Sequence, residues 1–383
     1  MKYISLPAFL SIFSGKNSRT FQEFIGNAQV KSGNNFVSLK TYMKMRNISS
    51  TDIHVLYDHI INRNEYLTRF YNTSLSVSSP SNSDPISHMH IAEGPMPRNH
   101  LDNNTLVNYK NVIRNIHFRN ILQKTKSGFD NVPTFLNVLL DLYLREIIDY
   151  KILTPSAMHY SRNGRIGSVF SSFYFRASIL NPYLVYSLNH TVLKGERIFT
   201  PTLGWSSYAY GFLECSHTKE YVGTDVIADV CKKTAEFCDL YGRTVKSEIF
   251  CEPSEDLLHN ARFMKRYRSH FDVVFFSPPY YELELYPGAN QSTRRYKTYD
   301  EWLDGYWRAT MRLCYHVLEP GGKMCYILSS GGGKDETNIL QDMNRITKEF
   351  FSLTKTLPMY NKNVHVTAGS HRETSEKIVI FTK

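Results

Sequence analysis

The feature that most constrains the fold is an alternation of short apolar segments with amphipathic segments, which begins near residue 196. The short segments are rich in the β-branched and aromatic residues typical of strands. Segments with helical periodicity separate the first five of them, and this pattern is typical of a parallel sheet covered by helices on both faces. We therefore predict a doubly wound, Rossmann-like α/β domain. The predicted strands are 197–200, 220–225, 248–252, 271–277, 323–328 and 377–382, and the predicted helices are 206–214, 229–241, 255–268 and 299–318.

The segment 1–155 differs in composition, because it is polar and rich in Asn and Ser. Helical patterns over 53–70, 106–123 and 132–153 predict a mainly helical region, and the Ser/Pro-rich stretch 79–85 predicts a loop. No apolar run reaches the ~18 residues of a transmembrane helix, so no membrane partner is expected. We predict two domains, 1–155 and 156–383.

The net charge of +10 is unevenly distributed. The segment 1–50 contains seven Lys or Arg and one acid, a charge of +6, whereas the rest of the chain contributes +4. A basic arm favours a polyanion such as nucleic acid or an anionic membrane surface. A solvated basic surface has the same composition, so charge alone leaves both interpretations open.

Cysteine usage points to a reducing compartment. All six cysteines lie in the C-terminal half with no CxxC pair, so neither a zinc signature nor a disulfide framework is present, and we expect buried free thiols. His88 and His90 have no further ligands at metal-binding spacing, which favours a surface loop over a metal site. Pro7 interrupts the apolar start of the chain, so an intracellular rather than secreted protein is expected.

The sharpest motif is Ser277-Pro278-Pro279-Tyr280, directly after the predicted strand 271–276. In an open parallel sheet, ligands bind at the carboxyl ends of the strands. Two prolines fix their φ angles and remove two N–H donors, which leaves their carbonyls as rigid free acceptors. We expect the Ser277 hydroxyl and the Pro278 carbonyl to accept the two N–H groups of an exocyclic amine, with the Tyr280 ring stacked on a flat base.

This motif resembles the (Ser/Asn/Asp)-Pro-Pro-Tyr motif of S-adenosylmethionine-dependent DNA amino-methyltransferases, which act on the exocyclic amines of adenine or cytosine. The similarity spans about residues 160–383 and is strongest to phage- and virus-type enzymes. It implies S-adenosylmethionine as cofactor, DNA as partner, and a role such as that in restriction–modification. Serine at the first motif position is commoner in the N(4)-cytosine branch. Further similar positions are Leu285-Tyr286, Gln291-Ser292, Tyr296, 298–299, 301–303, 318–322 and 371–373.

The resemblance extends to a loop that lies beside the methionine part of the cofactor, with the family pattern Asp-Pro-(Phe/Cys)-Ala-Gly-(Ser/Trp)-Gly. Gly204 and Trp205 match this pattern. Thr200 stands where the family has an acid and Ser206 where it has the last glycine. The first change removes a partner for the cofactor ammonium, and the second narrows the approach of backbone to ligand.

Three further residues are predicted on the cofactor side. Asp225 ends the second predicted strand, downstream of Gly204 at the spacing from which a carboxylate binds ribose hydroxyls in nucleotide sites. The resemblance places Glu255 and its neighbour Ser254 near the adenine. For Glu255 and the adjacent Asp256, a role at a helix N-terminus is an equally good interpretation.

The segment 282–297 after the motif lacks a regular pattern, and a loop of this length in a compact domain is usually functional. Its cations and aromatic rings suit phosphates and an unstacked base. A capping box at Thr298 and Glu301 then predicts the start of the next helix, whose stripe of large apolar residues is assigned to the core. The predicted substrate-binding residues are Tyr286, Arg294, Arg295 and Tyr296.

The favoured interpretation is a DNA methyltransferase that acts on N(4) of cytosine rather than N(6) of adenine. The changes at Thr200 and Ser206 keep open a catalytically weakened nucleic-acid-binding protein of the same fold. Methylation of RNA or of a protein amide is a second enzymatic alternative. By elimination, the segment 1–155 is the candidate for reading the DNA sequence, or for dimerisation or partner binding.

Overall fold

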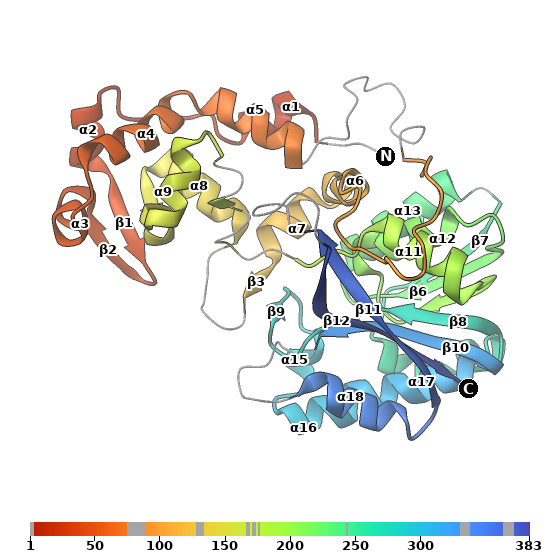
Figure 1. Cartoon of the computed structure of the whole chain (residues 1–383). Helices are drawn as coiled ribbons and strands as arrows, with labels where there is room; N and C mark the ends of the chain where they lie inside the picture. Colours follow the sequence, from red (N-terminus) through yellow and green to blue (C-terminus); the bar gives the residue numbers. More distant parts are fainter. Residues whose placement is uncertain are drawn as a thin grey trace. The chain divides into compact units, whose positions relative to one another are not determined.

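The computed structural model describes residues 4–74, 89–127, 134–165, 169–170, 174, 177–242, 244–329, 338–362 and 371–383. They form two compact units (Figure 1). The sheet unit contains Ser79–His117 and Ser178–Lys383, and the helical unit contains Lys2–Ser78 and Phe118–Ala177. The units interleave along the chain, so a single cut after residue 155 does not separate them. The predicted loop 79–85 and His88 lie outside the described residues.

The sheet unit is built on seven strands in the order β11-β12-β10-β8-β5-β6-β7. Neighbouring strands from β7 to β10 run parallel, whereas β12 is antiparallel to both β10 and β11. This order confirms the doubly wound, Rossmann-like α/β prediction. The strands are β5 (Arg197–Thr200), β6 (Glu220–Thr224), β7 (Lys246–Phe250), β8 (Phe271–Phe276), β10 (Leu318–Ser329), β11 (Ser352–Lys362) and β12 (His371–Thr382).

Helices cover both faces of this sheet (Figure 1). One side carries the helices that follow β5 and β6, and the other carries those that precede and follow β10. Because β8 is covered on both faces, its side chains read as an almost continuous apolar run, and five of its six residues are at most 1% exposed. The α-helices of the unit are α6 (Asn108–Ile116), α11 (Pro182–Leu188), α12 (Ser207–Leu213), α13 (Ala228–Tyr241), α14 (Ala261–Arg266), α15 (Ser292–Arg295), α16 (Tyr299–Trp302), α17 (Ala309–Val317) and α18 (Ile339–Thr347). The unit also contains the π-helical segments η2 (Asn189–Leu193) and η5 (Leu303–Arg308), the 3₁₀ segments η3 (Gly204–Ser206) and η4 (Ser254–His259), and the short strand β9 (Glu284–Leu285).

The segment 299–318 shows where local signals succeed and where they fail. Thr298 and Glu301 form the predicted capping box, and Trp302, Leu313 and Val317 of the predicted stripe are fully buried. The helix is not continuous in type, because a π-helical stretch, η5, separates α16 from α17. The sequence pattern did not predict this change of hydrogen bonding.

The helical unit is mainly α-helical, with a small sheet in the order β2-β1-β4 that the periodicity did not predict. Its aromatic core gathers around Phe9, whose ring lies 5.2 Å from Phe13 and 5.8 Å from Phe118. Most of the basic segment 1–50 is therefore folded into this unit. Its elements are α1 (Leu6–Ser11), α2 (Phe21–Asn27), β1 (Gln29–Ser32), β2 (Asn35–Ser38), α3 (Leu39–Arg46), α4 (Ser50–Ile61), α5 (Arg63–Ser74), α7 (Phe118–Lys124), β3 (Lys126–Ser127), α8 (Phe135–Arg145), β4 (Ile147–Asp149), η1 (Tyr150–Leu153) and α9 (Pro155–Arg162).

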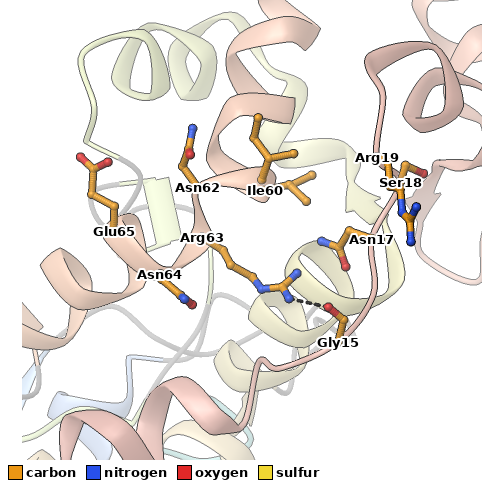
Figure 2. A pocket seen from close by; sticks show the side chains of 10 residues that line it. Gly15, Asn17, Ser18, Arg19, Ile60, Asn62, Arg63, Asn64 and Glu65 are labelled. Atoms are coloured by element: carbon orange, nitrogen blue, oxygen red, sulfur yellow. Dashed lines mark hydrogen bonds between the residues drawn. The ribbon is translucent and has the colours of Figure 1, made fainter.

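A pocket of about 460 Å³ lies in the helical unit, between residues 15–19 and the junction of α4 with α5 (Figure 2). The Arg63 guanidinium crosses it and donates to the Gly15 and Tyr143 carbonyls. Its charge thereby ties the loop to α5. None of the residues predicted to carry the chemistry lines this pocket.

Candidate active site

The predicted site residues follow strands that meet at a topological switch point of the sheet. Strands β5 and β8 are neighbours, with Ile198 opposite Val273. From β5 the chain continues to β6 on one side, whereas from β8 it continues to β10 on the other. Open α/β sheets bind ligands at the carboxyl ends of the strands at such a point. Two segments leave the sheet there: the β5 loop (Thr200–Ser206) and the motif (Ser277–Tyr280).

Within the motif, Ser277 is held by its backbone and keeps acceptor capacity on its side chain. Its N–H donates to the Tyr208 hydroxyl at 3.1 Å, and that hydroxyl lies 3.3 Å from the Ser277 carbonyl. The Ser277 Oγ donates to the Ile327 carbonyl at 3.1 Å. A hydroxyl has one proton and two lone pairs, so Oγ remains free to accept. No described residue donates to the Pro278 carbonyl, which gives the motif a second free acceptor.

Tyr280 is fixed from the end of the neighbouring strand. The Ser329 N–H, at the last residue of β10, donates to the Tyr280 hydroxyl at 2.8 Å. Burial raises the pKa of Tyr280 above its usual value, so the phenol stays neutral at physiological pH. The hydroxyl therefore anchors the Tyr280 side chain to the end of β10.

The β5 loop has an unusual backbone, because three successive residues have positive φ. These are Gly204 at 53°, Trp205 at 60° and Ser206 at 69°. A Cβ on Gly204 would lie 2.2 Å from the Tyr208 ring, so only glycine fits there. For Trp205 and Ser206 the left-handed conformation costs about 1–2 kcal/mol each. Strain of this kind persists where the surrounding structure holds it, and it clusters at functional sites.

The two departures from the family pattern, Thr200 and Ser206, both turn into the interior. Thr200 is fully buried, and its hydroxyl lies 2.9 Å from that of Tyr221. Ser206 is also fully buried, with Oγ 2.7 Å from His117 Nε2 and 2.6 Å from Thr234 Oγ1. Both hydroxyls are thus bonded to buried side chains of the protein, and neither takes the place of the carboxylate that the family pattern has in this loop.

Asp225 clamps the β5 loop to the end of β6. Its carboxylate accepts from the Leu203 N–H at 3.1 Å, the Val226 N–H at 2.8 Å and the Ile227 N–H at 3.1 Å. Burial raises the pKa of Asp225, and these three donors oppose the rise. Oδ2 accepts only one of the bonds, so it keeps a lone pair for a hydroxyl donor.

The structure joins a predicted substrate residue to a predicted cofactor residue. Arg295 lies 3.0 Å from Glu255 Oε1 and 2.6 Å from Asp256 Oδ1. Burial raises the pKa of Glu255, and the Arg295 charge opposes this rise. Ser254 is buried beside them, with its hydroxyl 3.1 Å from that of Thr310. Arg295 is thus engaged with carboxylates.

The remaining predicted substrate residues lie in different surroundings. Tyr296 belongs to the same cluster, with its hydroxyl 3.5 Å from Glu255 Oε1 and its ring 5.7 Å from the Arg295 guanidinium, whereas Tyr286 and Arg294 do not. The Tyr296 hydroxyl donates to the Gly305 carbonyl at 3.0 Å. The Tyr286 ring lies 5.7 Å from the Trp205 ring, and its hydroxyl donates to Glu284. Arg294 is exposed, and its side chain forms no ion pair with any residue that the structure describes. Lys297 of the same segment is likewise exposed and forms no ion pair with a described residue, so both cations are open to an anionic ligand.

We expect Arg294→Ala and Arg295→Ala to behave differently, although the residues are adjacent. For the DNA partner proposed below, loss of Arg294 should weaken binding several-fold and reduce the slope of log affinity against log salt by about 1, because one phosphate contact would be lost. Loss of Arg295 should leave that slope unchanged and lower the free energy of unfolding by about 1–3 kcal/mol, since it unpairs two acids. Salt-dependent DNA titrations and urea unfolding measure the two effects. Equal salt slopes for both variants would contradict this division.

Sequence reasoning missed the residues that support the site from other elements. Tyr208, His117 and Thr234 carry no local signal, since each looks like an ordinary helical or core residue in the sequence.

The expectation of buried cysteines is wrong for Cys251, which is exposed, and correct for the other five. Among the described residues, no three His, Cys, Asp or Glu side chains gather as a metal site, and no helix is long and apolar enough to cross a membrane.

Comparison with known proteins gives weak likenesses. No protein-family model and no curated protein matches the sequence. Among solved structures, TrmN from Thermus thermophilus is 14% identical, with 53% of this chain and 49% of TrmN covered and a TM-score of 0.35. The N-methyltransferase NodS from Bradyrhizobium japonicum with S-adenosyl-L-homocysteine is 12% identical (52% and 83% covered, TM-score 0.32). A putative RNA methyltransferase from Pyrococcus horikoshii is 15% identical (53% and 81%, TM-score 0.33). The chain spans about half of TrmN, and likenesses of this size carry no conclusion about activity.

Proposed function

We propose that the protein transfers a methyl group from S-adenosylmethionine to an exocyclic amino group of a base in DNA, at N(4) of cytosine rather than N(6) of adenine. The observation that carries this proposal is the motif at the carboxyl end of β8. It presents two free acceptors, the Ser277 hydroxyl and the Pro278 carbonyl, beside the anchored Tyr280 ring. An exocyclic amine has two N–H donors on a flat ring and matches this arrangement.

The residues of the site divide the work between the two ligands. Ser277 Oγ and the Pro278 carbonyl would accept the two amine N–H groups, which turns the nitrogen lone pair out of the plane of the base. The Tyr280 ring would stack on that base, a contact worth about 1–3 kcal/mol. Bound S-adenosylmethionine would supply an electrophilic methyl group. The amine is itself the nucleophile: its nitrogen would gain the methyl group as the methyl–sulfur bond of the sulfonium breaks to leave the thioether, and the proton that the nitrogen sheds would pass to water. No covalent enzyme intermediate is needed, and most of the rate would come from positioning.

The cofactor side fits this proposal through Asp225. Its Oδ2 keeps a lone pair at the carboxyl end of β6, where a ribose hydroxyl would donate. Glu255 supplies a second, buried carboxyl that follows β7, the parallel neighbour of β6. The strained β5 loop lies between Asp225 and the motif, because it is bonded to Asp225 through Leu203 and packed on Tyr208 through Gly204.

DNA in a duplex hides its amino groups, so the target base must be flipped out or already single-stranded, at a cost of a few kcal/mol. The serine hydroxyl can serve either base, and the preference for cytosine rests on the resemblance to the N(4) branch. The same acceptor geometry suits RNA or a protein amide. The buried Thr200 favours one further candidate, a weakened enzyme that binds nucleic acid, because it leaves the cofactor ammonium without an acid.

Calorimetric titration with S-adenosylmethionine tests the proposal first, and absence of binding at ~1 mM would contradict it. Given binding, transfer of a labelled methyl group to DNA, RNA and protein pools selects the substrate. Separation of the nucleosides after digestion then distinguishes N(4)-methylcytosine from N(6)-methyladenine. Label in RNA or protein alone would support the corresponding alternative.

Ser277→Ala should lower the rate of transfer about tenfold with little change in cofactor affinity, because it removes one acceptor for the amine. Thr191→Ala is a matched control. The Thr191 hydroxyl likewise donates to a backbone carbonyl, that of Ser187. Thr191 lies in η2, which precedes the amino end of β5, whereas the motif lies at the carboxyl end of the sheet. Single-turnover rates measure both variants. If Ser277→Ala transfers methyl as fast as Thr191→Ala, the role given to the hydroxyl is wrong.

A further inference from the structure

The β5 loop contains a serine in a conformation that normally belongs to glycine. Ser206 has φ 69° and ψ 0°, and it follows two residues that also have positive φ. Its own backbone N–H bonds to the Leu203 carbonyl at 3.0 Å, which closes the turn. A side chain resists this region because its Cβ approaches the carbonyl oxygen. Something outside the turn must therefore hold Ser206 there.

Two side chains from other elements form hydrogen bonds with the Ser206 hydroxyl. His117 Nε2 lies 2.7 Å from Oγ, and Thr234 Oγ1 lies 2.6 Å from it on the other side. All three side chains are fully buried. A hydroxyl can donate one hydrogen bond and accept another, so both contacts can be made at once. Burial lowers the pKa of His117 to about 3, which keeps the ring neutral with one N–H and one lone pair.

The three residues come from distant parts of the chain. His117 is the C-cap residue of α6. Thr234 lies in the middle of α13, the helix that follows β6. His117 also lies beside the loop's middle residue, with its ring 6.0 Å from that of Trp205. The turn Gly204–Ser206 is thus supported by side-chain contacts to two helices rather than by its own sequence.

We propose that His117 and Thr234 are positioning residues, which hold Ser206 in the left-handed conformation and thereby preset the β5 loop for the cofactor. The part of this inference that concerns the cofactor rests on the proposed function. It assigns a role in the cofactor site to a residue of the segment Ser79–His117, which lies far upstream of the first strand of the main sheet. It also accounts for a serine at the position where the resembling family has a glycine.

A matched pair of variants isolates the backbone effect. Ser206→Ala and Ser206→Gly both remove the hydroxyl and both leave His117 and Thr234 without their partner. Only glycine adopts this positive φ freely. We therefore expect Ser206→Gly to bind S-adenosylmethionine at least about tenfold more tightly than Ser206→Ala, by calorimetry. Equal affinities of the two variants would overturn the proposal.

A second comparison tests whether His117 acts through Ser206. His117→Ala should weaken cofactor binding about tenfold in the wild-type background and less than about threefold in the background of Ser206→Gly, since glycine needs no support. A merely structural histidine would give the same loss in both backgrounds, and that result would refute the positioning role. Thr234→Val is a second variant with nearly unchanged volume, should His117→Ala fail to fold. It is expected to show the same dependence on the residue at position 206.

Amide hydrogen exchange of residues 204–207 measures the local stability of the loop in the absence of cofactor. Exchange should be at least about tenfold faster in Ser206→Ala and His117→Ala than in Ser206→Gly. If the wild-type protein binds no S-adenosylmethionine, the proposed function fails, and the exchange rates still decide whether the three side chains hold the loop. If binding occurs and these exchange rates are equal, the present inference alone fails.

Discussion

Tyr280→Ala is expected to lower kcat/KM for methyl transfer by about two orders of magnitude while cofactor affinity stays within about threefold. The reason is the loss of a base-stacking surface worth about 1–3 kcal/mol, where about 1.4 kcal/mol corresponds to a factor of ten. The cofactor residues proposed here, Asp225 and Glu255, lie after β6 and β7 and do not depend on this ring. Single-turnover transfer measures the first effect, and calorimetry with S-adenosylmethionine measures the second.

Tyr280→Phe is the matched control, because it keeps the ring and removes only the hydroxyl that accepts from the Ser329 N–H. We expect it to lose no more than about tenfold in kcat/KM, since one buried donor is left unsatisfied but the stacking surface remains. If Tyr280→Ala retained more than a third of the wild-type rate, the ring would have no part in catalysis. If Tyr280→Phe lost as much activity as Tyr280→Ala, the hydroxyl rather than the ring would be the group that catalysis needs.

Gly204→Ala is expected to weaken cofactor binding by about a hundredfold or more. Two physical effects combine at this position. Alanine resists φ 53°, and its Cβ would lie 2.2 Å from the Tyr208 ring, which must then move. Movement of Tyr208 also breaks its bonds to the Ser277 backbone, so the motif is disturbed together with the loop. The free energy of unfolding should fall by about 2–4 kcal/mol. Calorimetry and urea unfolding provide the two measurements.

Gly94→Ala is the control for this variant. A Cβ at Gly94 meets no atom within 4 Å and the residue has no positive φ, so stability and cofactor affinity should stay close to those of the wild type. Wild-type cofactor affinity in Gly204→Ala would contradict the placement of the β5 loop in the cofactor site.

Much of the sheet could be predicted from the sequence because its central strands are buried on both faces. The strand Phe271–Phe276 stands out as an apolar run for this reason. Strand β11 was missed because it forms the edge of the sheet, where Leu353 is 45% exposed and charged residues interrupt the pattern. The small sheet β2-β1-β4 was missed since its strands are only three or four residues long.

The candidate site could be predicted only in part, for a similar reason. Short motifs fix residues that are adjacent in sequence, such as Ser277 and Tyr280, and the order of strands then brings Gly204 and Asp225 to the same edge. Ion pairs and buried hydrogen bonds join residues that are far apart in sequence. Arg294 and Arg295 are indistinguishable as letters, yet only Arg295 faces two carboxylates.

Hydrophobic periodicity and proline geometry act locally, so the amino-acid sequence was enough to predict the doubly wound sheet and to place the Ser-Pro-Pro-Tyr motif after its strand. How the neighbouring loop is held depends instead on the tertiary structure. The support of Ser206 requires His117, 89 residues earlier, and Thr234, 28 residues later. A left-handed serine is unfavourable alone and becomes acceptable when buried partners satisfy its hydroxyl. That condition exists only after the chain has folded.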